Sequence, residues 1–151
     1  MTDFQLPDGL LFNRGPIADP AAYAEDVACA SWLCLTGEEF AAMEGGMSFG
    51  AVEAAVPVAA NVISDPPRTL DLDLARRHIE ALDELPRPTL VSCRAGPRAS
   101  AVVYMYAGLR AGASPEDVVA ALERDGAPCA RMDDVKTWIV DSIRALSPDG
   151  A

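Results

Sequence analysis

A cysteine followed by a short glycine-containing turn is the part of this sequence best suited to chemistry. The segment reads Cys93-Arg94-Ala95-Gly96-Pro97-Arg98-Ala99-Ser100, with an apolar run before it and helix-forming residues after it. In a strand–turn–helix arrangement, backbone N–H groups and the positive end of the helix dipole point toward the turn. Both stabilise a thiolate and a bound oxyanion, so we expect Cys93 to be a nucleophile with a depressed pKa. Arg94 and Arg98 add positive charge at the same place.

The other loop residues have separate expected roles. Gly96 lets the backbone bend where a side chain would obstruct an anion. Pro97 removes one N–H donor from the anion cradle. Besides these two, the predicted anion-binding loop comprises Arg94, Ala95, Ala99 and Ser100. The alternative interpretation is that Cys93 is an inert, buried cysteine at the end of a core strand.

The remaining cysteines and the single histidine carry weaker signals. Cys29 and Cys34 do not have a zinc-binding spacing, and we interpret them as small buried apolar residues. Cys129 is either a resolving thiol for Cys93 or a loop cysteine without a role. His78 is expected at an ordinary helix position. No metal site is predicted, and the chemistry of a thiolate needs no cofactor.

Strands and helices alternate along the chain, which predicts an α/β domain with a small, mostly parallel sheet flanked by helices. Apolar runs predict strands at 10–13, 31–35, 57–63 and 89–92. Helical spacing and caps predict helices at 21–27, 38–43, 49–55, 71–85, 98–111, from Ser114 onward, and at 132–146. The helix after the loop is apolar on nearly every face and should be buried. We expect one domain over 1–151, with an irregular lead-in at 1–18 and the C-terminal helix within 127–151.

Composition restricts the partners of this domain. The net charge of −11 argues against nucleic acid, whose phosphates would be repelled. No apolar stretch is long enough for a membrane span, and no basic segment followed by an apolar run begins the chain. We therefore expect a cytoplasmic protein that does not act at a membrane, with a local positive pocket for a small anionic substrate.

The loop resembles the active loops of two enzyme families. Cys93 to Ala99 is similar to the Cys-Arg-Ser/Ala-Gly-x-Arg-Ser/Ala loop of rhodanese-type sulfurtransferases. It also resembles the Cys-x5-Arg-Ser/Thr loop of protein tyrosine phosphatases, but only four residues separate Cys93 from Arg98. In the phosphatase register the arginine position falls on Ala99, and Ser100 stands where Ser or Thr belongs. A smaller ring of N–H groups suits a persulfide sulfur, and a larger one suits a phosphoryl group held by a bidentate arginine.

The chain beyond the loop resembles the tail of a dual-specificity phosphatase. A buried helix is followed by the helix start Gly112-x-Ser114-x-Glu116 and then by a third helix. Such phosphatases keep a general-acid aspartate on a loop before the nucleophile, and the resemblance places it at Asp65, within Ser64-Asp65-Pro66-Pro67. From the residues alone, Asp65 is a turn residue before two prolines. Arg68 and Arg131 are candidates for the mouth of the pocket on charge alone.

The combination resembles one family whose members are described as phosphatases or sulfur transferases. Its domain also occurs fused to metallo-β-lactamase-like persulfide dioxygenases. The resemblance extends loosely over residues 8–126 and is specific from Leu90 to Gly112. Two positions depart from it: Ser92 stands where a histidine commonly precedes the nucleophile, and Pro97 lies within the loop.

Three functions are compatible with these features. The first is a sulfurtransferase, in which Cys93 takes sulfur from a thiosulfate-like donor, holds it as a persulfide and passes it to a thiol acceptor, with Arg98 stabilising the anion. The second is a protein tyrosine or dual-specificity phosphatase that forms a cysteinyl-phosphate on Cys93 while Asp65 protonates the leaving oxygen. The third is a catalytically weak or inactive module that binds an anion or a partner.

Overall fold

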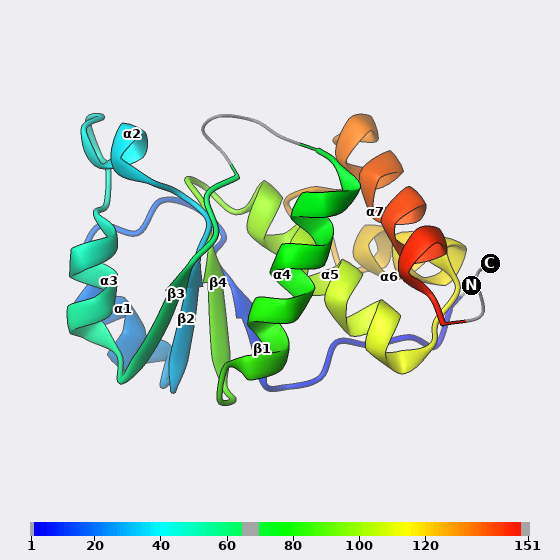
Figure 1. Ribbon diagram of the computed structural model, residues 1–151, viewed down its shortest axis with the longest axis horizontal. Helices are drawn as coiled ribbons and strands as arrows, with labels where there is room; N and C mark the ends of the chain where they lie inside the picture. Colours follow the sequence, from blue (N-terminus) through cyan, green and yellow to red (C-terminus); the bar gives the residue numbers. More distant parts are fainter. Residues whose placement is uncertain (1, 65–69, 149–151) are drawn as a thin grey trace.

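Residues 2–64 and 70–148, which the computed structural model describes, fold into a sheet with helices on both of its faces (Figure 1). The strands are β1 (Leu10–Phe12), β2 (Ser31–Cys34), β3 (Val58–Asn61) and β4 (Thr89–Ser92). The helices are α1 (Pro20–Val27), α2 (Glu38–Ala41), α3 (Phe49–Ala55), α4 (Leu72–Glu84), α5 (Pro97–Ala111), α6 (Pro115–Arg124) and α7 (Asp133–Leu146). The predicted alternation of strands and helices is confirmed.

Strand β4, which leads into the cysteine loop, lies in the middle of the sheet. The strand order is β1-β4-β2-β3, and every pairing among these strands is parallel. All residues of β2 and β4 are buried, as expected for the centre of a parallel sheet. Because the strands run in one direction, their carboxyl ends share one edge, where ligands of open α/β sheets bind. The loop after Ser92 begins at this edge.

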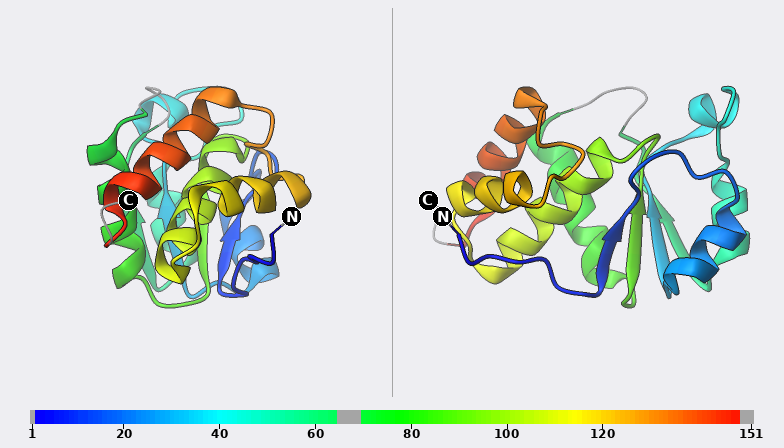
Figure 2. Two further views of the ribbon diagram at one scale, coloured as in Figure 1. Left: turned by 90° about the vertical axis from the view of Figure 1, so that its right-hand side faces the viewer. Right: turned by 180° about the vertical axis from the view of Figure 1, so that it is seen from behind.

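Helices α1 and α3 cover one face of the sheet, and α4, α5, α6 and α7 lie on the other side (Figures 1 and 2). The side chains of β2 and β4 divide between these layers because successive residues of a strand point to opposite faces. Trp32 and Leu90 belong to the cluster beneath α1 and α3, whereas Leu33 and Val91 join the larger cluster with α5. The sheet therefore separates two apolar cores.

Helix α5 is the central helix of the larger layer. Its residues from Arg98 to Leu109 are all buried, which confirms the prediction from its apolar faces. It packs closely on α6, since a Cβ on Gly108 would lie 2.3 Å from a methyl carbon of Val118. The residue Gly112 then ends α5 in a left-handed conformation, with φ of 70°. The helix is thereby fixed between the sheet and the two helices that follow.

Side-chain caps explain where several helices begin. The carboxylate of Asp71 accepts from the N–H of Leu74 at 2.8 Å at the start of α4. At the start of α6, the hydroxyl of Ser114 accepts from the N–H of Asp117 at 3.1 Å. Such caps satisfy N–H groups that have no partner within the helix. The predicted starts near Asp71 and Ser114 are therefore confirmed to within a residue.

Some predicted boundaries are wrong. The strand expected at 57–63 is limited to Val58–Asn61, and the helix expected at 38–43 ends at Ala41. These ends depend on backbone pairing and turns that apolar spacing does not record. The helix predicted at 132–146, within the C-terminal segment 127–151, is confirmed as Asp133–Leu146. In the described part of the chain, no helix is long and apolar enough to cross a membrane.

Candidate active site

Cys93 is the first residue after β4, and its thiol lies under backbone N–H groups at the start of α5. The sulfur accepts hydrogen bonds from the N–H of Gly96 at 3.1 Å and from the N–H of Ala99 at 3.4 Å. Only 3% of the residue is exposed. Helix α5 directs its free N–H groups and the positive end of its dipole toward the sulfur. The loop is therefore built to stabilise negative charge.

Gly96 is required for this loop geometry. Its φ is 116°, a conformation that residues with a Cβ rarely adopt. A Cβ at this position would lie 2.3 Å from the backbone oxygen of Asn13 and 3.2 Å from Pro128. The predicted need for glycine is confirmed, although the obstructed group is the chain's own backbone rather than an anion.

The pKa of Cys93 differs from the prediction. Burial raises the pKa of this thiol above its ordinary value, while hydrogen bonds from the backbone N–H groups of Ala99, Gly96, Ala95 and Arg98 lower it. Burial has the larger effect, because a buried thiolate loses its hydration. The expected depression of the pKa is therefore wrong.

A cavity of about 380 Å³ gives access to Cys93. The guanidinium of Arg94 lies 5.8 Å from the centre of the Phe40 ring, in a cation–π contact on the cavity wall. Among the described residues that line this cavity, Glu44 is the one with a carboxylate. The full lining comprises Pro16, Phe40, Glu44, Gly45, Cys93, Arg94, Ala95, Pro97 and Met132. An anion in this cavity would meet the backbone of the loop and one arginine side chain.

Arg98 is not one of the described residues that line this cavity. It is buried, and its guanidinium lies 5.0 Å from the centre of the Trp138 ring. His78 meets the same ring edge-on, at 6.0 Å between ring centres. The sequence indicated two arginines near Cys93, Arg94 and Arg98. Of these two, Arg94 is the one on the cavity wall.

His78 lies in α4, as predicted, and is fully buried there. Burial lowers its pKa to about 3, and the charges of Arg98 and Arg77 act in the same direction. Neither ring nitrogen has a hydrogen-bond partner among the described residues. The imidazole is therefore neutral and serves in packing behind the loop, not beside the thiol.

Two serine side chains connect the loop to neighbouring segments by hydrogen bonds. Ser92, the residue before Cys93, accepts a hydrogen bond from the indole N–H of Trp32 at 2.7 Å. Ser100 donates to the carbonyl of Pro97 at 2.9 Å and accepts from the N–H of Cys129 at 3.2 Å. Ser92 thus ties the loop to β2, and Ser100 ties it to the segment before α7.

Asn13 contributes to the loop, and sequence reasoning did not single it out. Its side-chain oxygen accepts from the N–H of Cys93 at 3.2 Å, and its side-chain nitrogen donates to the carbonyl of Cys93 at 3.1 Å. The two residues are far apart in sequence, and the pairing of β1 with β4 brings them together. No local pattern around Asn13 marks this contact.

The other predicted residues lie elsewhere. Asp65 and Arg68 fall outside the described residues. Arg131 is exposed and is not among the described residues that line the cavity of Cys93. Cys29, Cys34 and Cys129 are all free thiols, and Cys34 and Cys129 are fully buried. Within the described residues, no group of His, Cys, Asp and Glu side chains is arranged to hold a metal ion.

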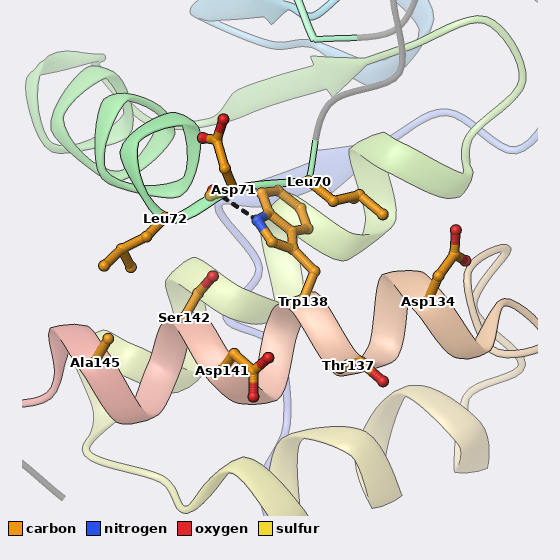
Figure 3. Close-up of a pocket in the computed structure, with 9 residues that line it drawn as sticks. All are labelled: Leu70, Asp71, Leu72, Asp134, Thr137, Trp138, Asp141, Ser142 and Ala145. Atoms are coloured by element: carbon orange, nitrogen blue, oxygen red, sulfur yellow. Dashed lines mark hydrogen bonds between the residues drawn. The ribbon is translucent and has the colours of Figure 1, made fainter.

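A larger cavity, of about 580 Å³, lies between the start of α4 and α7 (Figure 3). The indole N–H of Trp138 donates to the carbonyl of Asp71 at 2.8 Å across its inner wall. The carboxylates of Asp134 and Asp141 point to different sides of α7 in this view. This cavity contains no residue of the Cys93 loop, so its size does not make it the active site.

Known structures with the same fold support this description of the molecule. A protein from Shewanella putrefaciens CN-32, provisionally named a phosphatase, superposes with a TM-score of 0.68 at 17% identity, covering 95% of this chain and 91% of its own. Tk-PTP, solved in its active form, has a TM-score of 0.68 at 14% identity, covering 91% and 92%. The catalytic core of the PP-IP phosphatase SIW14 from S. cerevisiae, in complex with citrate, has a TM-score of 0.61 at 17% identity, covering 91% and 82%.

At these identities the likeness establishes the fold. The chain has the fold of protein tyrosine phosphatase-like and dual-specificity phosphatase-like proteins, which confirms the predicted fold class. No family profile matches the sequence, and no curated protein sequence matches it.

Proposed function

We propose that this protein is a cysteine-dependent phosphatase acting on a small anionic phosphate ester. The observation that carries the proposal is the position of the Cys93 sulfur, 3.1 Å from the N–H of Gly96 at the start of α5 and open to a cavity. The phosphatase-like fold supports this choice over sulfur transfer. One of the neighbours with this fold is a PP-IP phosphatase that was solved with the anion citrate.

The first chemical step transfers the phosphoryl group to sulfur. The Cys93 thiol first loses its proton to water in the cavity; the resulting thiolate attacks phosphorus, an S–P bond forms, and the P–O bond to the leaving group breaks. The developing negative charge on the phosphoryl oxygens is stabilised by the N–H groups of the loop and by the Arg94 guanidinium. The leaving oxygen takes a proton, for which Asp65 is the proposed donor.

The second step regenerates the thiolate. Water attacks phosphorus, the S–P bond breaks, and inorganic phosphate leaves while the thiolate returns to its N–H partners. The water proton goes to the base that donated in the first step. Asp65→Asn is expected to slow turnover because its amide cannot donate and recover this proton.

Sulfur transfer is a second candidate, because of one feature of the loop. Four residues separate Cys93 from Arg98, and the Arg98 side chain packs on Trp138 instead of lining the cavity. A phosphoryl group thus lacks the bidentate arginine that the longer loop supplies. In this alternative, Cys93 takes the outer sulfur of thiosulfate, sulfite leaves, and an acceptor thiol removes the sulfur from the persulfide.

Steady-state hydrolysis of p-nitrophenyl phosphate tests the phosphatase proposal. Cys93→Ser is expected to abolish hydrolysis, because the serine hydroxyl is a much weaker nucleophile than a thiolate. Cys129→Ser is the matched control, since it removes another buried thiol adjoining Ser100 and should retain activity. Equal rates in Cys93→Ser and the unaltered protein would refute the proposal. Wild-type protein that binds phosphate without hydrolysing any ester would support an anion-binding module instead.

A further inference from the structure

The side chain of Asn13 replaces the backbone partner that Cys93 would otherwise have in the sheet. Backbone pairing of β1 with β4 ends at Phe12 and Val91. Beyond that point, the Asn13 carboxamide bonds to both the N–H and the carbonyl of Cys93, at 3.2 and 3.1 Å. Its nitrogen also donates to the carbonyl of Gly15 at 2.9 Å. Asn13 is fully buried, and these bonds use both of its side-chain donors.

These bonds determine the direction of the first peptide of the loop. The carbonyl of Cys93 and the N–H of Arg94 belong to one planar trans peptide, so they point in opposite directions. The carbonyl faces Asn13, which is not among the described residues lining the cavity, whereas Arg94 is. The N–H of Arg94 therefore points away from Asn13. The N–H of Cys93 is occupied by Asn13 and is not available to an anion.

We propose that Asn13 is a positioning residue for the anion site: by holding both backbone groups of Cys93, it directs the Arg94 N–H to the bound oxyanion and fixes the sulfur under the loop donors. This inference rests on the proposed function, because it concerns the same loop. It adds a residue that directly follows β1, is distant in sequence from the loop and does not touch the substrate. Without these bonds, the peptide is free to turn its carbonyl toward the anion.

Asn61 provides a matched control for this role. It is also an asparagine at the carboxyl end of a strand, and its side-chain nitrogen donates to the carbonyls of Cys34 and Thr36 at 2.8 and 2.9 Å. Asn61 does not line the cavity of Cys93. Loss of Asn61 should therefore lower stability without changing the anion site.

Tungstate binding measured by calorimetry tests the role without requiring turnover. Asn13→Asp keeps the size and the acceptor oxygen but loses both N–H donors, and we expect its tungstate affinity to fall by about tenfold or more. Asn13→Ala should behave in the same way, whereas Asn61→Ala should stay within about a factor of two of wild type. Equal losses in Asn61→Ala and the Asn13 variants would show a merely structural role and overturn the inference.

An NMR titration of the unaltered protein tests the same point independently of any variant's folding. On adding tungstate, the backbone amide signal of Arg94 should shift strongly and that of Cys93 should not, because Asn13 occupies the latter. Tungstate binding with an unmoved Arg94 amide would overturn the role of Asn13 alone. Wild-type protein that binds no tungstate would overturn this inference and the proposed anion site together.

Discussion

The loop donors and the burial of Cys93 act on its ionisation in opposite senses. Burial raises the pKa of the thiol, and four backbone N–H groups lower it by a smaller amount. Strong hydrogen bonds from the N–H groups and access of water to the sulfur therefore both favour the thiolate. The reactivity of Cys93 therefore depends on how the loop places its N–H groups around the sulfur.

Alkylation of Cys93 by iodoacetamide should depend on pH in a way that reports this balance. Because the pKa is raised, the neutral thiol predominates near neutrality and the reactive thiolate appears only at higher pH. The alkylation rate of the protein without added ligand should therefore still be rising at pH 9, an ordinary thiol's pKa. Peptide mass spectrometry follows the rate at Cys93, with Cys93→Ser giving the background. A plateau below pH 8 would contradict a raised pKa.

Replacement of Gly96 tests the loop backbone itself. Gly96→Ala introduces a Cβ at φ of 116° and 2.3 Å from the oxygen of Asn13, so the loop must shift. We expect a loss of about 3 kcal/mol or more in the free energy of unfolding, together with loss of phosphate-ester hydrolysis. Gly15→Ala is the control, because Gly15 has φ of 129° with nothing within 4 Å, and should cost about 1–2 kcal/mol. Equal losses in both variants, by urea denaturation, would contradict the steric argument.

At this scale, the sequence identified the candidate nucleophile but not its full surroundings. Cys93, Gly96 and the loop N–H groups follow from a strand–turn–helix pattern that is local in sequence. The direction of a side chain is not local, so Arg94 and Arg98 could not be told apart by spacing. Asn13 reaches Cys93 only because β1 and β4 are neighbours in the folded sheet.

At the scale of elements, α4 and α7 contact the helix that follows the loop through a cluster of aromatic and charged side chains. Trp138 of α7 lies between Arg98 of the loop helix and His78 of α4. Its indole N–H also holds the carbonyl of Asp71 at the start of α4. Helix periodicity predicted both helices and the buried face of α7, including Trp138. It did not predict that His78 would face this cluster.

The buried imidazole of His78 should make the protein sensitive to acid. Its pKa is about 3 when folded and 6.5 as the ordinary value, so the unfolded chain binds a proton that the folded protein does not. The contribution of His78 to stability is complete above pH 6.5 and is lost as the pH falls toward 3, by up to about 1.4 kcal/mol per pH unit.

Urea denaturation of wild type and His78→Leu across this range measures the contribution. Carboxylates affect both proteins alike, so the difference between the two is the informative quantity. The free energy of unfolding of wild type should fall more steeply with acid than that of the variant. Parallel pH profiles would show that His78 is not buried as a neutral group.

The whole molecule combines a net negative charge with a proposed anion-binding loop. A net charge of −11 repels anions at long range, so attraction must come from groups close to the substrate. The N-terminus of α5, the loop N–H groups and Arg94 supply that local field. A small substrate that enters the cavity fits this arrangement better than a long polyanion that also meets the surface.

The architecture was predictable because alternating strands and helices allow few arrangements. Right-handed crossovers place helices on both faces, and short apolar strands such as β4 become central. Helix ends were less predictable, since they depend on turns and tertiary contacts. The reaction depends on one residue of loop length and on the direction of an arginine, which are properties of individual residues and not of a fold shared at low identity.

Mass spectrometry of the Cys93 peptide tests the central claim most directly. The protein is exposed separately to p-nitrophenyl phosphate and to thiosulfate, quenched rapidly, and compared with Cys93→Ser. We predict that the aryl phosphate adds the mass of one phosphoryl group to Cys93, and that no adduct forms in the variant. A persulfide formed from thiosulfate, with no phosphoryl adduct from the ester, would contradict the phosphatase account.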